Sequence, residues 1–355
     1  MKILLYVLAL LSLFSCQETH SPALPFVQQV LPTQVLDQIG DSLYLGYLRW
    51  MTASEDHIFI SDHHEDHVIM LDHDLNLVKV LGREGRGPGE FNGPAFSAVG
   101  QGQLWIDDPG NIRFQVYSLD GDFLKTVPIN HIEDQIGTFG TFAIDHKGFI
   151  WLSNDEGEKP LVRMDQEGKV VARYPVQPAL YPGYTHTAHL MTSSQQHLIS
   201  MRLMDGLLEK FDLNGQLIEQ LDLGLLLGMD STFEAVNQYL ASQQVDFVRQ
   251  YADIFTPAFI FQDQLFVCQF ITDRETIRTR QEGSANNLLV FDLYPQFQLR
   301  HRYKLLMPQE AEGDGALVEA ALAFEKEGKT FLLAASYMSE LLYLYELPQT
   351  TPPPK

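Results

Sequence analysis

The stretch Ile58-Phe-Ile-Ser-Asp62 decides the fold, because a short apolar strand of this kind returns five more times along the chain. The later copies are Leu104-Trp-Ile-Asp107, Ile150-Trp-Leu-Ser-Asn154, Leu198-Ile-Ser-Met201, Leu265-Phe-Val-Cys268 and Phe331-Leu-Leu-Ala334. Their first residues are separated by 46, 46, 48, 67 and 66 positions. Such spacing indicates that one structural unit is repeated six times.

Each copy is the second strand in a series of segments that recurs in the same order. A weaker apolar stretch precedes it and a further strand follows it, as Val68-Ile-Met-Leu71 follows the first copy. The first four units continue through an acidic turn, such as Asp120-Gly-Asp122, into one more strand, and these residues favour tight hairpins. Four short antiparallel strands repeated at about 40–50 residues are typical of propeller blades. The alternative, a β-sandwich with irregular strands, leaves the repeated spacing unexplained.

The sequence therefore predicts an all-β protein, a six-bladed β-propeller of four-stranded antiparallel blades over residues 26–348. The sixth unit lacks its last strand, because the chain meets Pro348 soon after the third. The segment Phe26-Val-Gln-Gln-Val30 has no unit of its own. We expect it to be the outer strand of blade six, which would close the ring and leave no open edge.

Two patterns resemble a known family. Blades that run apolar strand, Asp turn, apolar strand, Asp-x-x-Gly are similar to those of NHL-type and TolB-like propellers. The loop Gly82-Arg-Glu-Gly-Arg-Gly-Pro-Gly-Glu-Phe91 resembles a Gly-Pro-Gly-Glu loop of six-bladed β-propeller lipoproteins from Bacteroidetes-type bacteria. The resemblance covers roughly residues 26–348. It implies a fold and a cell-envelope location more than a reaction.

The N-terminus predicts export. Lys2 precedes the apolar run Ile3–Phe14, which matches the charged and hydrophobic regions of a signal peptide over residues 1–15. The following Leu13-Phe14-Ser15-Cys16 resembles a bacterial lipobox, so Cys16 is the expected lipidation site, with an attached acyl chain such as palmitate. The alternative is a plain secreted protein whose cysteine is incidental. Residues 16–25 are then a tether, and residues 349–355 a disordered tail.

Composition limits the partners. The chain of 355 residues has 24 Lys and Arg against 46 Asp and Glu, which gives a net charge of −22. Nucleic acid is therefore not expected as a partner, because its binding requires a basic surface. Two cysteines cannot build a disulfide scaffold, and Cys268 in its apolar run is expected to be a core residue.

Long connections are expected on one face. In a four-stranded blade, the turn between the second and third strands and the link to the next blade reach one face, called here the elaborated face. The remaining turns reach the other, called the hairpin face. The elaborated face receives residues 82–94, 130–140, 177–186, 222–256, 272–287 and 308–315. Within these, about 231–252 is expected to be a helical insertion between blades four and five, because its apolar residues recur at helical spacing. Long loops often carry function.

Three groups of residues are candidate sites. The first is the cluster His63, His64, Asp66 and His67, whose imidazoles and carboxylate are possible zinc ligands. Its spacing is one residue short of the zincin motif, and the group falls in a turn. A solvated hairpin turn is the competing interpretation.

The second group lies where the second strands end. Asp62, Asp107 and Asn154 would converge near the channel mouth, where their oxygens could hold Ca²⁺. Six-bladed lactonases, which the architecture resembles, hold such a central ion. Arg202 in blade four does not complete an acidic ring but could contact a ligand. The alternative is that each side chain caps its own turn.

The third group is the glycine-rich loop, in which Arg86 and Glu90 could meet a ligand. It is neither a Walker loop nor a dinucleotide fingerprint, and it could also be only a connector between blades.

The function expected from the sequence is a lipid-anchored envelope module, in the outer membrane, that binds a glycan, peptide or envelope protein through the elaborated face. No cofactor is required for that role. The alternative is a metal-dependent hydrolase or lyase with its site at the channel mouth, using Ca²⁺ or Zn²⁺.

Overall fold

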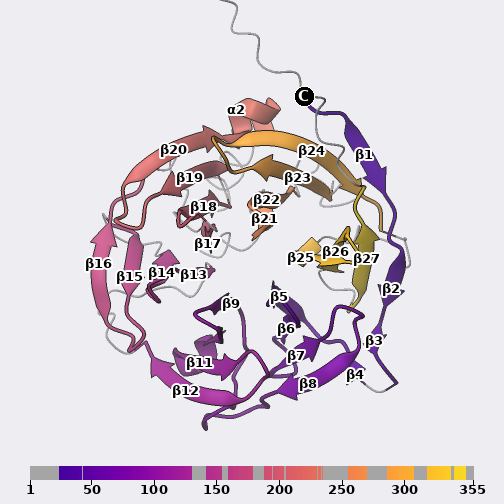
Figure 1. The fold of residues 1–355 in the computed structure, drawn as a ribbon, viewed down its shortest axis with the longest axis vertical. Helices are drawn as coiled ribbons and strands as arrows, with labels where there is room; N and C mark the ends of the chain where they lie inside the picture. Colours follow the sequence, from indigo (N-terminus) through magenta and orange to yellow (C-terminus); the bar gives the residue numbers. More distant parts are fainter. Residues whose placement is uncertain are drawn as a thin grey trace, which may run out of the picture.

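A computed structural model describes residues 24–41, 43–129, 141–153, 159–178, 188–193, 195–203, 205–229, 231–232, 234, 255–269, 286–307, 318–336 and 340–348. Over these residues the chain forms a ring of six sheets around a central axis (Figure 1). The predicted fold, a six-bladed propeller of four-stranded antiparallel blades, is confirmed.

Blades one to four each use four consecutive strands, ordered from the axis to the rim (Figure 1). Blade one has β5 (Leu48–Ala53), β6 (Ile58–Asp62), β7 (His67–Leu71) and β8 (Leu77–Leu81). Blade two has β9 (Ser97–Gly100), β10 (Gln103–Asp108), β11 (Arg113–Ser118) and β12 (Phe123–Pro128). Blade three has β13 (Phe142–Ile144), β14 (Ile150–Ser153), β15 (Leu161–Met164) and β16 (Val170–Tyr174). Blade four has β17 (Ala188–Thr192), β18 (Leu198–Arg202), β19 (Leu207–Phe211) and β20 (Leu217–Asp222).

Blades five and six complete the ring with help from the N-terminal segment. Blade five has β21 (Phe255–Phe261), β22 (Gln264–Gln269), β23 (Asn287–Asp292) and β24 (Gln298–Leu305). Blade six has β25 (Val318–Lys326), β26 (Lys329–Ser336) and β27 (Leu342–Glu346). Their outer edges are covered by β1 (Val27–Val30) and β2 (Gln34–Leu36), which precede the small hairpin of β3 (Gln38–Ile39) and β4 (Leu43–Tyr44).

The expected closure by residues 26–30 is wrong in its details. Strand β1 pairs in parallel with β24 and becomes a fifth strand of blade five. The outer strand of blade six is instead β2, which pairs antiparallel with β27. An outer strand is largely solvated, and both β1 and β2 combine glutamine with apolar residues. Apolar content therefore could not distinguish the two segments.

Most of the core lies between neighbouring blades, and the buried Trp50 of blade one also reaches His189 of blade four across the ring. The second strand of blade one is buried along its whole length, whereas four of the five residues of the outer strand β8 are exposed. This gradient explains why the second strands carried the repeat signal, since a strand buried on both faces is apolar throughout. Cys268 is 1% exposed in the cluster shared by blades five and six, so its predicted core position is confirmed.

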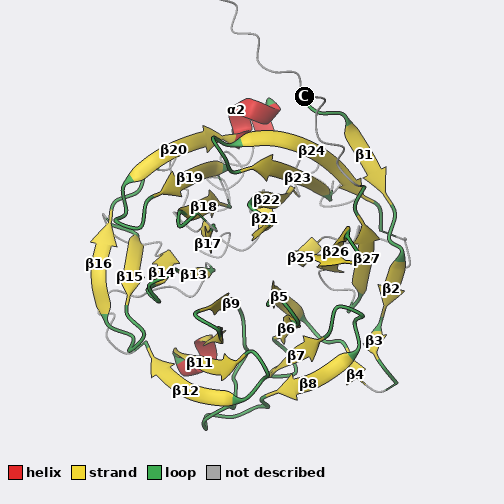
Figure 2. Cartoon of the chain, in the orientation of Figure 1, coloured by secondary structure: helices red, strands yellow, loops and turns green. Residues whose placement is uncertain are grey.

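Helical segments are short in the described part of the chain, and Figure 2 shows α2 (Leu223–Leu227) at the periphery. Helix α2 begins where the Asp222 carboxylate accepts a hydrogen bond from the Leu225 amide, and it ends at Gly228, whose φ is +68°. Of the predicted helix at 231–252, residues 231, 232 and 234 are helical and the rest lie outside the described residues. Among the described helices, none is long and apolar enough to cross a membrane.

Candidate functional site

The acidic residues that end the second strands of blades one and two brace the ring. Asp62 accepts a hydrogen bond from the Gly46 amide at 2.8 Å, and Asp108 accepts one from the Asn92 amide at 2.8 Å. In both cases the amide lies in the linker that precedes the blade, 16 residues back. Asp62 also accepts from the amides of His64 and Glu65 in its own turn. In each of these two blades, the carboxylate at the end of the second strand therefore ties the blade to the linker before it.

Blades four and five use the same position with different chemistry. The Arg202 guanidinium donates to the backbone carbonyls of Gln177 and Pro178 at 2.7 and 3.2 Å, and it pairs with Asp205 at 2.7 Å. In blade five, the Gln269 side chain lies 2.9 Å from the Met229 sulfur. These side chains reach toward linkers around the ring instead of converging on one ion. Asn154 lies outside the described residues.

Asp107 is not the equivalent of Asp62, although both were grouped from the sequence. The strand register and the repeat spacing make Asp108 the equivalent of Asp62. Because side chains alternate along β10, Asp107 faces the other side of the strand. Asp107 is 4% exposed, and its Oδ1 has no hydrogen-bond partner among the described residues. Burial, with a smaller effect of the neighbouring Asp108, raises its pKa to about 8. At neutral pH this carboxyl is therefore mostly protonated.

The glycine-rich loop is held together by its own polar groups. The Glu90 carboxylate accepts hydrogen bonds from the Gly87 amide at 2.7 Å and from the Arg83 guanidinium at 2.9 Å, which lowers its pKa. The exposed side of the loop carries the Arg86 side chain. The loop backbone is fixed by Arg113, which donates to the carbonyls of Arg86, Gly87 and Glu90. Glu90 thus maintains the loop conformation.

The turn that carries His63, His64, Asp66 and His67, called here the histidine turn, packs against the linker between blades one and two. The Asp66 carboxylate accepts a hydrogen bond from the Gly93 amide at 2.5 Å, and a Cβ on Gly93 would stand 2.6 Å from the His63 ring. His64 is exposed, and His67 pairs with Asp62 in the β6–β7 ladder. Within the described ranges, no three His, Cys, Asp or Glu side chains are grouped so that they could hold a metal ion.

A cluster that the sequence analysis missed lies at the channel mouth of the elaborated face. The first strands lie nearest the axis (Figure 1), and each enters from this face. Arg49 at the start of β5 pairs with Glu319 at the start of β25 at 2.6 Å, and the Tyr47 hydroxyl donates to the same carboxylate at 3.0 Å. We call Tyr47, Arg49, Trp50, Phe96, His189 and Glu319 the channel-mouth cluster.

Aromatic rings surround the ion pair. The Arg49 guanidinium lies 5.6 Å from the centre of the Phe96 ring and 5.9 Å from that of Tyr47. Trp50 meets His189 edge-on at 5.0 Å between ring centres. Such cation–aromatic contacts stabilise the cation and fix its direction.

His189 is a neutral part of this wall. Its Nδ1 accepts a hydrogen bond from the Ala258 amide at 2.9 Å. Burial, with a smaller contribution from the Arg49 charge, lowers its pKa to about 3. His189 is therefore uncharged at neutral pH, and it is not a ready proton donor.

The mouth also reaches the histidine turn. The Tyr47 ring lies edge-on to His63 and His64, with ring centres 5.9 and 6.4 Å apart. The Arg49 and Glu319 side chains are 33% and 16% exposed, so the pair is partly desolvated but still accessible. This arrangement can hold a polar ligand by charged hydrogen bonds and by contact with the half-buried Tyr47 ring. Sequence reasoning missed it because Arg49 and Glu319 are 270 residues apart.

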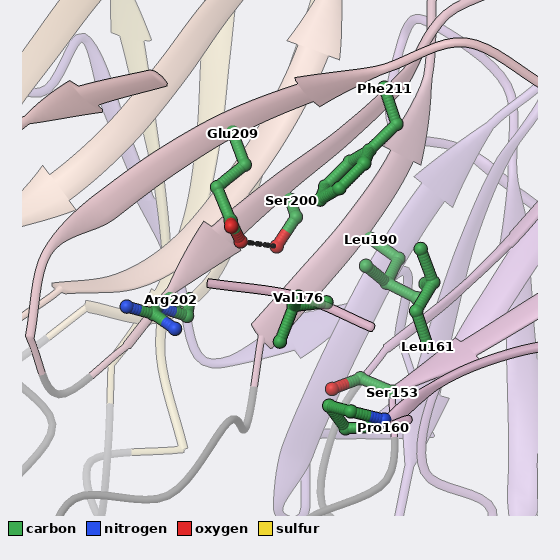
Figure 3. Close-up of a pocket in the computed structure, with 9 residues that line it drawn as sticks. All are labelled: Ser153, Pro160, Leu161, Val176, Leu190, Ser200, Arg202, Glu209 and Phe211. Carbon is green, nitrogen blue, oxygen red and sulfur yellow. Dashed lines mark hydrogen bonds between the residues drawn. The ribbon is translucent and has the colours of Figure 1, made fainter. Parts of the chain in front are cut away.

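A second polar feature is buried between blades three and four (Figure 3). The cavity has a volume of about 10 Å³, enough for about one water molecule. Glu209 accepts a hydrogen bond from the Ser200 hydroxyl at 3.3 Å, and burial raises its pKa to about 7. This cavity is too small for a ligand, so we assign it to the core.

No family model matches the sequence, and no curated protein matches it. Several solved structures share the fold. A streptogramin B lyase aligns with a TM-score of 0.52 and 13% identity, over 89% of this chain and 88% of that one. A Bacteroides vulgatus member of the DUF4221 family aligns with a TM-score of 0.54 and 9% identity, over 90% and 97%. A Bacteroides fragilis protein named as exported aligns with a TM-score of 0.52 and 12% identity, over 79% and 80%. At these identities the similarity establishes the propeller fold alone.

Proposed function

We propose that this protein is a lipid-anchored binding module of the bacterial cell envelope, and that its ligand contacts the channel-mouth cluster. The single observation that carries the proposal is the partly exposed Arg49–Glu319 pair at 2.6 Å, set among aromatic rings where the inner strands enter the ring. A glycan, a peptide or a segment of an envelope protein has the hydrogen-bonding groups to engage this pair.

The position of the cluster supports the same conclusion. Propellers place the starts of all first strands around one channel mouth, so a ligand there is reached by side chains from several blades. The described strands that flank three long connections, β20 and β21, β22 and β23, and β24 and β25, end and begin on the elaborated face, and loops on a rigid scaffold commonly carry binding function. The described part of the hairpin face has short turns instead, such as Asp212–Gln216.

The alternative is an enzyme at the same mouth, a metal-dependent hydrolase or lyase. The streptogramin B lyase shares the fold, and fold by itself does not transfer a reaction. The described carboxylates at the ends of the second strands are bonded to linker amides, and His189 is buried and neutral. These contacts favour binding over catalysis. A stoichiometric divalent ion in the purified mature protein would reverse that preference.

Removal of the mouth ion pair tests the binding function. We expect Arg49→Ala with Glu319→Ala to weaken ligand capture from a solubilised envelope fraction about tenfold, or about 1.4 kcal/mol, because both partners of one charged contact are lost together. The measurement is quantitative pull-down followed by titration of the captured ligand. The matched control is Lys79→Ala with Asp122→Ala, which removes an ion pair of 2.9 Å on the hairpin-face side. Loss of capture in the control alone would place the ligand on the hairpin face and would contradict the proposal.

Lipid anchoring is tested separately. We expect Cys16→Ala to move the protein from the membrane fraction to the soluble fraction, because stable anchoring takes more than one acyl chain or signal and Cys16 would carry these chains. Fractionation with immunoblotting measures the change. Unchanged membrane partitioning of the variant would contradict the anchor but leave the binding function at the channel mouth open.

A further inference from the structure

A pocket lies on the hairpin face between blades four and five, away from the channel mouth. Its volume is about 550 Å³, within the range of small-molecule sites. Its walls come from the β17–β18 turn, from β19 and β20, and from the β23–β24 turn. The lining residues are Gln195, His197, Lys210, Ile218, Tyr294 and Pro295.

A chain of hydrogen bonds fixes the polar wall of this pocket. The Tyr294 hydroxyl lies 2.5 Å from the Ser193 hydroxyl and 2.8 Å from Nδ1 of His197. The Ser193 oxygen also accepts a hydrogen bond from the His197 amide at 3.2 Å, and Ser193 is buried. Two blades are thus connected through three side chains, and the position of each polar atom is set before any ligand arrives.

The protonation state of His197 is set by its surroundings. Desolvation, followed by the Lys210 charge, lowers its pKa, so the imidazole is neutral at neutral pH. A neutral imidazole carries one N–H and one acceptor nitrogen. Nδ1 shares its hydrogen bond with the Tyr294 hydroxyl in either tautomer, so Nε2 is the ring nitrogen that remains to donate to a ligand or to accept from it.

Among the described lining residues, the only cation is already neutralised. The Lys210 ammonium lies 2.5 Å from Glu219 and 2.7 Å from the Leu293 carbonyl, and its side chain is 3% exposed. It also lies 5.0 Å from the centre of the Tyr294 ring. An anionic ligand would find no available positive charge here on a chain of net charge −22. A cationic ligand would find no carboxylate among the described lining residues to pair with. The pocket therefore favours a neutral ligand.

We propose that this pocket binds one ring of a neutral saccharide. A pyranose has an apolar C–H face and hydroxyls that both donate and accept hydrogen bonds. The Tyr294 ring, Pro295 and the 52% exposed Ile218 supply the apolar contact. The Gln195 amide and Nε2 of His197 supply the polar contacts. This site is separate from the channel mouth, so it stands or falls independently of the function proposed there.

The test is saturation-transfer NMR on the full folded protein with maltose, cellobiose, mannobiose and diacetylchitobiose as probes. We expect at least one of them to bind, with the strongest transfer to its ring C–H protons. Gln195→Ala, at an exposed side chain, should weaken that binding about threefold, and Gln195→Ala with His197→Ala about tenfold or more. The control is Gln216→Ala, another exposed amide of the same face outside the pocket.

Three results would overturn the site. One is that the natural protein transfers saturation to none of the four probes. Another is tighter binding of glucose 6-phosphate than of every neutral probe, since that would require an available cation. The third is weakening by Gln216→Ala equal to that by Gln195→Ala. A melting curve of each variant shows whether the fold is retained, and the Gln195→Ala variant keeps the test decisive if the His197 variant does not fold.

Discussion

Arg202→Met is expected to lower the free energy of unfolding by about 3–5 kcal/mol, because the buried Asp205 carboxylate loses the guanidinium that compensates its charge. The Arg202 and Asp205 side chains are 1% and 0% exposed, and they lie 2.7 Å apart. The substitution also leaves the carbonyls of Gln177 and Pro178 without their donor. Chemical denaturation at neutral pH measures the loss.

Two further variants separate the buried pair from general damage. Arg202→Met with Asp205→Asn should recover a large part of the loss, because both charges of the pair are removed together. Arg83→Met removes an exposed guanidinium that pairs with Glu90, and exposed pairs contribute at most about 1 kcal/mol. A loss in Arg202→Met no greater than that in Arg83→Met would mean that the brace in blade four is unimportant for stability.

The second large effect is expected from the strands that close the ring. Deletion of residues 24–37 from the otherwise full chain should destabilise the propeller by about 3–5 kcal/mol, since each fully buried Val or Leu contributes about 1.5–3 kcal/mol. The deletion removes the buried Val30 and the partly buried Leu36, and it uncovers the edges of β24 and β27. Thermal unfolding followed by circular dichroism measures the change.

A shorter deletion assigns the effect to one strand. Removal of residues 24–31 takes away β1 but keeps β2 on blade six, so we expect about half the loss. Removal of residues 349–355 should have little effect, because the last strand, β27, ends at Glu346. Equal melting temperatures for the two N-terminal deletions would show that β2 is not needed for closure.

Much of the fold was predictable because the signal is local. Ile58–Asp62 and its later copies are buried on both faces of their strands, so each is apolar within four or five residues. The acidic hairpins were equally visible, as in Asp212, whose carboxylate accepts from the Asn214 and Gln216 amides. Outer strands carry no such signal, which is why residues 26–30 were assigned to the wrong blade.

The candidate sites were harder to predict. Polar residues at the ends of strands looked like ligands for an ion, and the sequence could not show that Asp62 reaches Gly46 or that Arg202 reaches Gln177. Glu90 was grouped with Arg86 as a ligand contact, yet it is bonded inside its own loop. A polar side chain next to a turn has the same sequence pattern whether it binds a ligand or a backbone amide.

By itself, the sequence determined the number of blades, the positions of their second strands and the faces that their connections reach, because these depend on residues close together in the chain. Only the tertiary structure decided which strand closes blade six, which polar side chains brace the linkers, and which residues meet at the channel mouth and in the pocket on the hairpin face. Arg49 and Glu319 are 270 residues apart, and Ser193 and Tyr294 are 101 apart. Arg49 and Glu319 meet because the ring closes and brings blade one beside blade six, whereas Ser193 and Tyr294 meet because consecutive blades pack side by side. No local pattern of residues records either contact.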